Sequence, residues 1–228
     1  MFLASFASGL WQANCYVVAA AGATDCVVID PGQDAAPLVG ELLGEHGLTP
    51  VGVIATHGHF DHVASAAQVA DAHGVPVWIH PVDRHLLSDP AAGLSADSAA
   101  MVRQLLGGPL AEPAMVESLA VASLSLAGLE FSVAHAPGHT AGSVLLGLDY
   151  PGHPQIGRVV FSGDVVFAGS VGRTDLPGGD QATMVRTLQD VVLALPDDTA
   201  LLPGHGTQTT MATERAQNPY LQPAFLRN

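Results

Sequence analysis

Three histidines and an aspartate fall in one short stretch of the sequence, directly after an apolar run. The run covers residues 51–55, and His57, His59, Asp61 and His62 follow it within seven positions. A buried strand cannot hold these side chains, because a polar group without a partner loses its hydration at a cost of roughly a few kcal/mol. We therefore expect them just past the carboxyl end of a buried strand, where layered α/β folds place their ligands.

Imidazole nitrogens and carboxylate oxygens are ligands that zinc and other divalent metals accept. His57 and His59 lie two residues apart and point the same way from an extended segment. Asp61 and His62 fall where the next helix begins and face a neighbouring point. This spacing favours two adjacent metal ions over one. A histidine-rich surface turn is the ordinary alternative, and partner residues elsewhere in the chain argue against it.

Those partner residues follow three later predicted strands. The strands cover residues 129–135, 159–162 and 200–202, and the side chains that follow them are His139, Asp164 and His205. A glycine adjoins each one, which lets the backbone approach a site closely because glycine has no Cβ. Seven ligands exceed the needs of one tetrahedral ion, but they suit two ions about 3.5–4 Å apart with a bridging carboxylate.

The elements that must hold these loops are predicted from hydrophobic pattern and from glycine and proline punctuation. An opening antiparallel sheet is expected from residues 2–6, 14–20 and 25–29, with further strands at 51–55 and 77–79. Helices are expected over 35–46 and 63–73, each closed by a glycine. A second sheet is expected from residues 121–126, 129–135, 143–148 and 159–162, before the terminal strand at 200–202. Residues 81–108 form a helix-and-loop region without a clear pattern.

Composition narrows the class of protein. The chain has 228 residues with 48% hydrophobic content, enough for one sizeable core, and we expect a single domain over residues 1–228. Its net charge is −14, with 21 acidic residues against seven arginines and no lysine. That balance excludes the basic stripe of a nucleic-acid-binding protein. Any anionic group of a substrate must then be held by arginine or by backbone N–H groups.

The sequence also predicts where the protein works. The first arginine is Arg84, so a secretory signal is not expected. The sequence contains no run of about 18 uninterrupted apolar residues, so we expect neither a membrane span nor a membrane partner. A cytoplasmic location follows. Cys15 and Cys26 lie in consecutive predicted strands and are expected to be reduced core thiols, with a disulfide as the open alternative.

The seven candidate ligands occur in the order His-x-His-x-Asp-His, His, Asp, His, and this pattern resembles the metallo-β-lactamase-fold superfamily over nearly the whole chain. The resemblance implies an α/β (α+β) fold, a four-layer αββα sandwich with the site along one edge. A closer similarity, to the short glyoxalase II-type hydroxyacylglutathione hydrolases, is carried by several short segments. These are Asn14-Cys15-Tyr16, Asp30-Pro31-Gly32, Ala136-Pro137-Gly138-His139-Thr140, Phe161-Ser162-Gly163-Asp164, Gly172-Arg173-Thr174-Asp175, Gly204-His205-Gly206, Glu214 and Asn218-Pro219.

The resemblance assigns the ligands to two ions. One metal site would be His57, His59 and His139, the other Asp61, His62 and His205, with Asp164 bridging them and with Asp61, His62 and Asp164 as catalytic residues. Two divalent ions per chain are implied, zinc first, with iron or manganese as alternatives. Asp30 and Thr140 are candidates to orient imidazoles, or are ordinary loop residues.

The same resemblance implies hydrolysis of a thioester. A hydroxide held by the two metals would attack the thioester carbonyl, giving a 2-hydroxy acid and a thiol. Arg173 stands where that family has a lysine that grips the glutathione carboxylate, so Arg173 and Asp175 are substrate-binding candidates, with a local salt bridge as the alternative. Only 23 residues follow His205, so we expect no C-terminal helical glutathione-binding domain. The expected partner is a small-molecule thioester, and the oligomeric state stays open.

Three other functions compete with thioester hydrolysis. A persulfide dioxygenase of the same superfamily would use one iron, held by His57, His139 and Asp164. A lactonase would share the chemistry and differ in its pocket, whereas a non-catalytic metal-binding module would lack one or more ligands. β-Lactamase activity is less expected, because many zinc β-lactamases have Cys where this chain has Asp164. Retention of the full ligand set favours a hydrolase.

Overall fold

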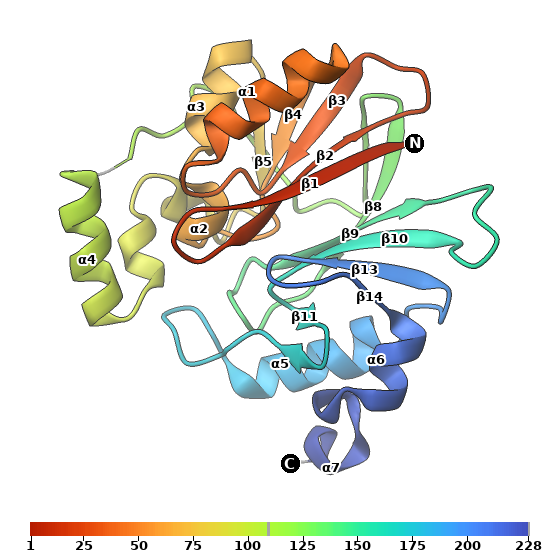
Figure 1. Ribbon diagram of the computed structural model, residues 1–228. Helices are drawn as coiled ribbons and strands as arrows, with labels where there is room; N and C mark the ends of the chain where they lie inside the picture. The colour runs from red at the N-terminus through yellow and green to blue at the C-terminus, as the bar shows by residue number, and fades with distance from the viewer. Residues whose placement is uncertain (109, 228) are drawn as a thin grey trace.

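Two six-stranded sheets face each other, with helices on both outer sides (Figure 1). The computed structural model describes residues 1–108 and 110–227. The first sheet runs in the order β1 (Phe2–Ser8), β2 (Ala13–Ala19), β3 (Asp25–Ile29), β4 (Thr49–Ile54), β5 (Val77–Ile79) and β6 (Val116–Ser118). The second runs in the order β14 (Thr209–Thr210), β13 (Thr199–Pro203), β10 (Arg158–Gly163), β9 (Val144–Asp149), β8 (Leu129–His135) and β7 (Ser123–Leu126).

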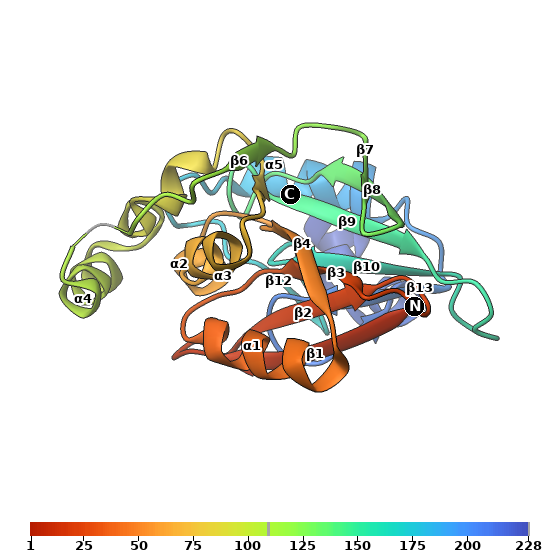
Figure 2. The same ribbon diagram turned by 90° about the horizontal axis from the view of Figure 1, so that it is seen from above.

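The helices complete four layers. Helices α1 (Ala35–His46) and α3 (Ala66–His73) cover the first sheet, and α5 (Gln181–Thr187) with α6 (Met211–Gln217) cover the second (Figures 1 and 2). The other helical segments are α2 (Phe60–Val63), α4 (Ala96–Leu106), α7 (Pro223–Leu226), the 3₁₀ turns η1 (Arg84–Leu87), η2 (Pro90–Gly93) and η4 (Pro219–Leu221), and the π-helix η3 (Leu188–Val192). A small hairpin joins β11 (Val166–Phe167) to β12 (Ser170–Val171). The predicted αββα sandwich is therefore confirmed.

Alternation along the strands builds the core between these layers. On β2, the side chains of Cys15 and Val17 pack with α1 and α3, whereas Tyr16 and Val18 pack between the sheets. This follows from the two-residue period of a strand, which sends successive side chains to opposite faces. Leu201 of β13 packs outward in the same way, with Met184 and the π-helix.

Two parallel strand pairs bring the functional loops to one edge. Strands β3 and β4 are parallel, with Ile29 opposite Ile54, so the residues after each strand emerge side by side. Strands β10 and β13 are also parallel, with Phe161 opposite Leu202. The carboxyl ends of parallel strands meet at the same edge of a sheet, which is where open α/β folds bind ligands.

Several predicted elements have different bounds in the structure. The single helix predicted over 63–73 is wrong: the structure has α2 and α3, and between them the Ser65 backbone N–H donates to Pro31 O at 3.0 Å. The strand predicted from residue 121 begins at Ser123. Residues 81–108, which showed no pattern, form η1, η2 and α4, and α4 projects away from the sandwich (Figure 1).

Both cysteines are buried free thiols, as the sequence predicted. Burial raises the pKa of Cys26 to about 12, so this thiol stays protonated at neutral pH. Within the described residues, each helix is too short or too polar to cross a bilayer.

Candidate metal centre

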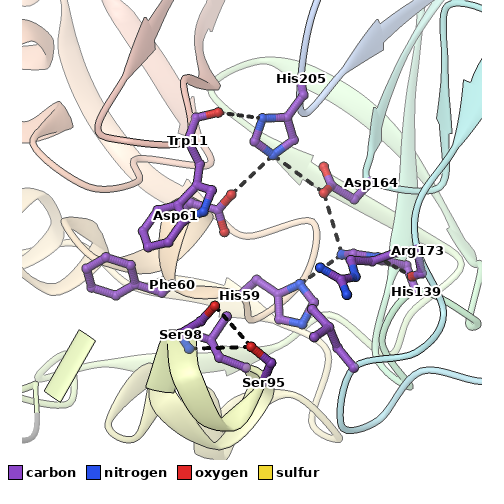
Figure 3. A pocket seen from close by; sticks show the side chains of 12 residues that line it. Trp11, His59, Phe60, Asp61, Ser95, Ser98, His139, Asp164, Arg173 and His205 are labelled. Atoms are coloured by element: carbon purple, nitrogen blue, oxygen red, sulfur yellow. Dashed lines mark hydrogen bonds and ion pairs between the residues drawn. The ribbon is translucent and has the colours of Figure 1, made fainter. Parts of the chain in front are cut away.

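The predicted ligands meet in two adjacent groups at the edge of the sandwich. The ligand atoms of His57, His59 and His139 lie within 4.8 Å of one another, and so do those of Asp61, His62 and His205. Figure 3 shows the members that line the pocket, converging from the two halves of the chain. Spacing had predicted this division, with His57 and His59 at one point and Asp61 and His62 at its neighbour.

Asp164 lies between the two groups. Its Oδ2 atom is 3.5 Å from His139 Nε2 in the first group and 3.5 Å from His205 Nε2 in the second. Its Oδ1 atom is 3.3 Å from His62 Nε2. One carboxylate therefore faces both groups, which is the geometry that a bridging ligand between two ions requires.

Local backbone explains how these side chains approach so closely. A Cβ on Gly204 would lie 2.2 Å from Asp164 Oδ1 and 2.6 Å from His62 Cε1. A Cβ on Gly172 would lie 1.8 Å from the Asp164 carbonyl oxygen. Only glycine fits at these two positions without displacing the ligands.

Hydrogen bonds on the far side of two rings fix their orientation. His139 Nδ1 donates to Arg173 O at 2.8 Å, and His205 Nδ1 donates to Trp11 O at 3.0 Å. Each bond places the ring proton on Nδ1 and leaves the lone pair of Nε2 facing the site. Metal-binding histidines are held in this way by carbonyls and carboxylates behind them.

Asp30 holds the rings of His57 and His62 at the inner end of the site. Its Oδ2 accepts from His62 Nδ1 at 3.1 Å and from the Thr56 hydroxyl at 2.7 Å. That hydroxyl lies 3.1 Å from His57 Nδ1 and accepts a hydrogen bond from this nitrogen, because the hydroxyl hydrogen is already donated to Asp30. Asp30, His57 and His62 also form a cluster with metal-ligand spacing, but the oxygens of Asp30 are engaged by these donors. We therefore interpret Asp30 as the support of two ligands.

Thr140 makes no hydrogen bond to an imidazole, which corresponds to the second of its two predicted roles, that of a loop residue. Its hydroxyl donates instead to Asp83 Oδ2 at 2.6 Å, which also accepts from the backbone N–H of Gly58 at 3.0 Å. Asp83 Oδ1 accepts from the backbone N–H of Gly142 at 2.8 Å. This buried carboxylate ties the loop of His57 and His59 to the loop of His139. Sequence reasoning missed it because it lies in the region without periodicity.

Two buried polar atoms test whether the residues fit a metal. His57 Nε2 has no hydrogen-bond partner, and Asp164 Oδ1 has only the ion-pair contact with His62 Nε2; an unpaired buried polar atom costs roughly 1–3 kcal/mol. An ion between the two groups would satisfy both atoms. The donor set, imidazole and carboxylate, is one that zinc, iron and manganese accept. The residues present therefore fit divalent cations.

Burial and neighbouring charges set the protonation states of the proposed ligands. Burial lowers the pKa of His57 well below its ordinary value and lowers that of His59 to about 3, so both rings are neutral. Burial alone would raise the pKa of Asp164, but His62 outweighs it and the pKa falls well below its ordinary value. Asp61 is lowered in the same way, with burial outweighed first by His62. In the second group, burial alone would lower the pKa of His62 and of His205, but Asp164 and Asp61 outweigh it and raise both, so a cation there must displace a ring proton. The neutral rings of His57 and His59 and the ionised carboxylates favour a cation.

A pocket of about 250 Å³ opens onto the two groups (Figure 3). Its wall adds side chains that the sequence did not single out, which are Trp11, Phe60, Leu94, Ser95, Ser98 and Leu176. Leu94, Ser95 and Ser98 come from the start of α4 and the residue before its N-cap, so the region without periodicity forms one wall.

The two substrate-binding candidates are paired with each other. Arg173 lines the pocket, and its Nε and Nη2 atoms donate to Asp175 Oδ1 and Oδ2 at 2.7 and 2.8 Å. The salt-bridge alternative is therefore present in the structure. Both side chains are more than half exposed.

The family model described as the metallo-beta-lactamase superfamily matches residues 8–205. An uncharacterised protein of Mycobacterium tuberculosis is 40% identical over 97% of this chain and 98% of its own length. The probable metallo-hydrolase YqgX of Bacillus subtilis is 33% identical, covering 92% of each chain. Hydroxyacylglutathione hydrolase GloC of Haemophilus influenzae is 32% identical, covering 86% of this chain and 87% of its own.

Two solved structures have the same fold, and their sequence identity to this chain is slightly higher than that of GloC. The B3 metallo-beta-lactamase BLEG-1 superposes with a TM-score of 0.81 at 35% identity, covering 97% of this chain and 100% of that one. TTHA1623, solved in a di-iron-bound form, gives a TM-score of 0.74 at 35% identity, covering 96% and 100% of the two chains.

Proposed function

The chain belongs to the metallo-beta-lactamase superfamily, and from that premise we propose that it is a dinuclear metal-dependent hydrolase of thioesters. The proposed reaction converts an S-2-hydroxyacyl thiol and water into a 2-hydroxy acid and a thiol. The observation that carries the proposal is the second ligand group, Asp61, His62 and His205, beside the first, with Asp164 facing both. A protein that used a single ion would not need the second group.

Seven residues would hold the cofactors. His57, His59 and His139 would hold one ion, Asp61, His62 and His205 the other, and Asp164 would contact both. We propose zinc, which these ligands suit, with iron or manganese as alternatives. The di-iron form of TTHA1623 supports iron as an occupant of such a site. Bound here, the two cations supply Lewis acidity, which lowers the pKa of water and draws charge from a carbonyl oxygen.

The chain's own residues handle the proton and the geometry. Water oxygen bonds to the thioester carbonyl carbon, the C–S bond breaks, and the sulfur leaves as a thiolate that takes up a proton. Asp61 Oδ2 lies 3.1 Å from His205 Nε2 at the pocket wall, where it can accept the proton of the attacking water. His62 Nε2 lies 3.7 Å from the same Asp61 oxygen and 3.3 Å from Asp164 Oδ1, so it holds the two carboxylates beside each other. These three residues are the proposed catalytic set. Trp11 and Phe60, whose rings lie 5.8 Å apart, form an apolar wall that limits access of bulk water.

The first experiment combines metal content with four assays on one preparation. We expect close to two metal ions per chain and hydrolysis of S-2-hydroxyacyl thioesters. One iron per chain with oxygen uptake on a persulfide would replace the proposal with a persulfide dioxygenase. Turnover of a β-lactam without thioester hydrolysis would replace the proposal with a β-lactamase. The similarity to BLEG-1 makes this a specific alternative. Turnover of a lactone alone would make the protein a lactonase.

Replacing His59 tests the site itself. His59→Ala should lose at least about half of the bound metal and lower kcat by 100-fold or more, because the variant removes one ligand of the first group. His73→Ala is the matched control, since His73 is exposed on the last turn of α3. Full metal content and turnover in His59→Ala would contradict the assignment.

A further inference from the structure

The charge of the pocket bears on which thiol the substrate carries. Glutathione presents two carboxylates, and a site that binds it needs cationic or N–H partners for them. The chain has no lysine, and among the described residues that line the pocket Arg173 is the one arginine. Recognition of an anionic carrier at this pocket therefore depends on Arg173.

Arg173 is already neutralised. Asp175 takes two hydrogen bonds from the guanidinium, at 2.7 and 2.8 Å, in the forked geometry that a substrate carboxylate would use. Asp175 raises the pKa of Arg173, and Arg173 lowers that of Asp175 to about 2, so both stay charged at neutral pH. A carboxylate that arrived here would have to displace Asp175 or add a second negative charge beside it.

The start of α4 offers no replacement for Arg173. Ser95 caps this helix, with its hydroxyl accepting from the Ser98 backbone N–H at 3.4 Å and donating to Ser98 Oγ at 3.0 Å. Asp97 lies in the first turn, so a carboxylate of the chain already occupies the positive end of the helix. Apart from the proposed metal ligands, the rest of the wall is apolar, from Trp11, Phe60, Leu94 and Leu176.

We propose that the enzyme acts on thioesters whose thiol carrier is uncharged beside the sulfur, rather than on those recognised through carboxylates of the carrier. The inference rests on the proposed thioester hydrolysis and names the substrate class of that site. The carrier lies against the apolar wall of Trp11 and Leu176, and the paired Arg173 and Asp175 present no net charge to it.

A matched pair of substrates tests the inference. S-Lactoyl-N-acetylcysteine and its methylamide share the acyl group and the thiol, and they differ by one carboxylate. We expect kcat/KM to be at least about five-fold higher for the methylamide, the factor that a unit charge at 4 Å is worth in bulk water. Equal values, or a preference for the carboxylate, would overturn the inference while leaving thioester hydrolysis in place. Failure to hydrolyse either one would remove the proposed function and the inference with it.

A charge substitution tests the cause. Asp175→Asn frees the guanidinium, so the ratio of kcat/KM for the carboxylate substrate to that for the methylamide should rise about five-fold, mainly through KM. Asp197→Asn is the control, because Asp197 forms an equally short pair with Arg215, at 2.8 Å, outside the residues that line the pocket. It makes the same change in net charge and should leave the ratio as it is. An unchanged ratio in Asp175→Asn would show that Asp175 does not neutralise Arg173 toward a substrate carboxylate, and it would contradict the proposed cause.

Discussion

Asp83 links the two ligand loops through backbone donors. Its side chain is 2% exposed, and it accepts from Gly58, Gly142 and the Thr140 hydroxyl. Gly58 lies between two of the proposed ligands, and Thr140 follows a third. The carboxylate therefore sets the distance between parts of the first group that come from opposite sheets.

Removing this carboxylate should cost both stability and metal affinity. Asp83→Ala leaves the backbone N–H groups of Gly58 and Gly142 without an acceptor, whereas the Thr140 hydroxyl still has Ser143 Oγ at 2.8 Å. We expect a loss of about 2–5 kcal/mol in the free energy of unfolding. Asp83→Asn should lose less, because its amide oxygen still accepts while its NH₂ group faces a donor. In Asp83→Asn, metal affinity should fall on the order of ten-fold, which is the usual effect of replacing a residue that holds metal ligands in place. Urea unfolding and metal titration measure the two effects.

The control for this prediction is another carboxylate removed from a place without contacts. Glu41 is exposed on α1, so Glu41→Ala should change stability by less than about 0.5 kcal/mol. Equal stability of Asp83→Ala and Glu41→Ala would mean that the Asp83 network does not stabilise the fold.

At the same scale, spacing predicted ligand positions better than it predicted their supports. His57, His59, Asp61 and His62 are close in sequence, so local geometry alone divides them into two groups. The partner of Thr140 is 57 positions away, in a segment with no period to place it. Sequence patterns carry local geometry, whereas a contact between loops depends on how two sheets pack.

Helix α1 contains a local conflict between sequence and structure. Gly40 and Gly44 lie inside it, and a Cβ at either position would meet no atom within 4 Å. Glycine inside a helix costs about 0.5–1 kcal/mol relative to alanine. Gly40→Ala should therefore raise the free energy of unfolding by roughly that amount in urea titration.

Gly47 is the matched comparison for this helix. It caps α1 with φ at 62°, a left-handed conformation in which its N–H donates to Leu43 O. Gly47→Ala also has open space around it, but its backbone would be strained, so stability should fall by about 1 kcal/mol. A gain in stability from Gly47→Ala would contradict the conformational argument.

Some elements were predicted with the right bounds, and several of the shortest were not predicted at all. The helix over 35–46 and the strands over 25–29, 77–79 and 129–135 match the structure. Strands β6, β11, β12 and β14 have two or three residues each, too few to show a period. Their existence depends on neighbours: β6 pairs with β5 in parallel, across a separation of more than 35 positions. Pairing of that kind is a tertiary property that a local window does not contain.

The whole molecule carries a net charge of −14, which two divalent cations would offset only in part. An anionic thioester is therefore repelled as it approaches, before it reaches the pocket. Salt screens this repulsion, since the Debye length falls from about 30 Å at 0.01 M to about 10 Å at 0.1 M. We expect kcat/KM for S-lactoyl-N-acetylcysteine to rise at least about two-fold over that range, because the effect acts on association. The methylamide has no charge, so its kcat/KM should stay constant and serves as the control.

Initial rates in sodium chloride and in potassium chloride separate screening from specific binding of one salt. If kcat/KM for the carboxylate substrate instead falls as salt is added, attraction by a free cation dominates its approach, and Arg173 rather than the overall charge governs how an anionic carrier is received.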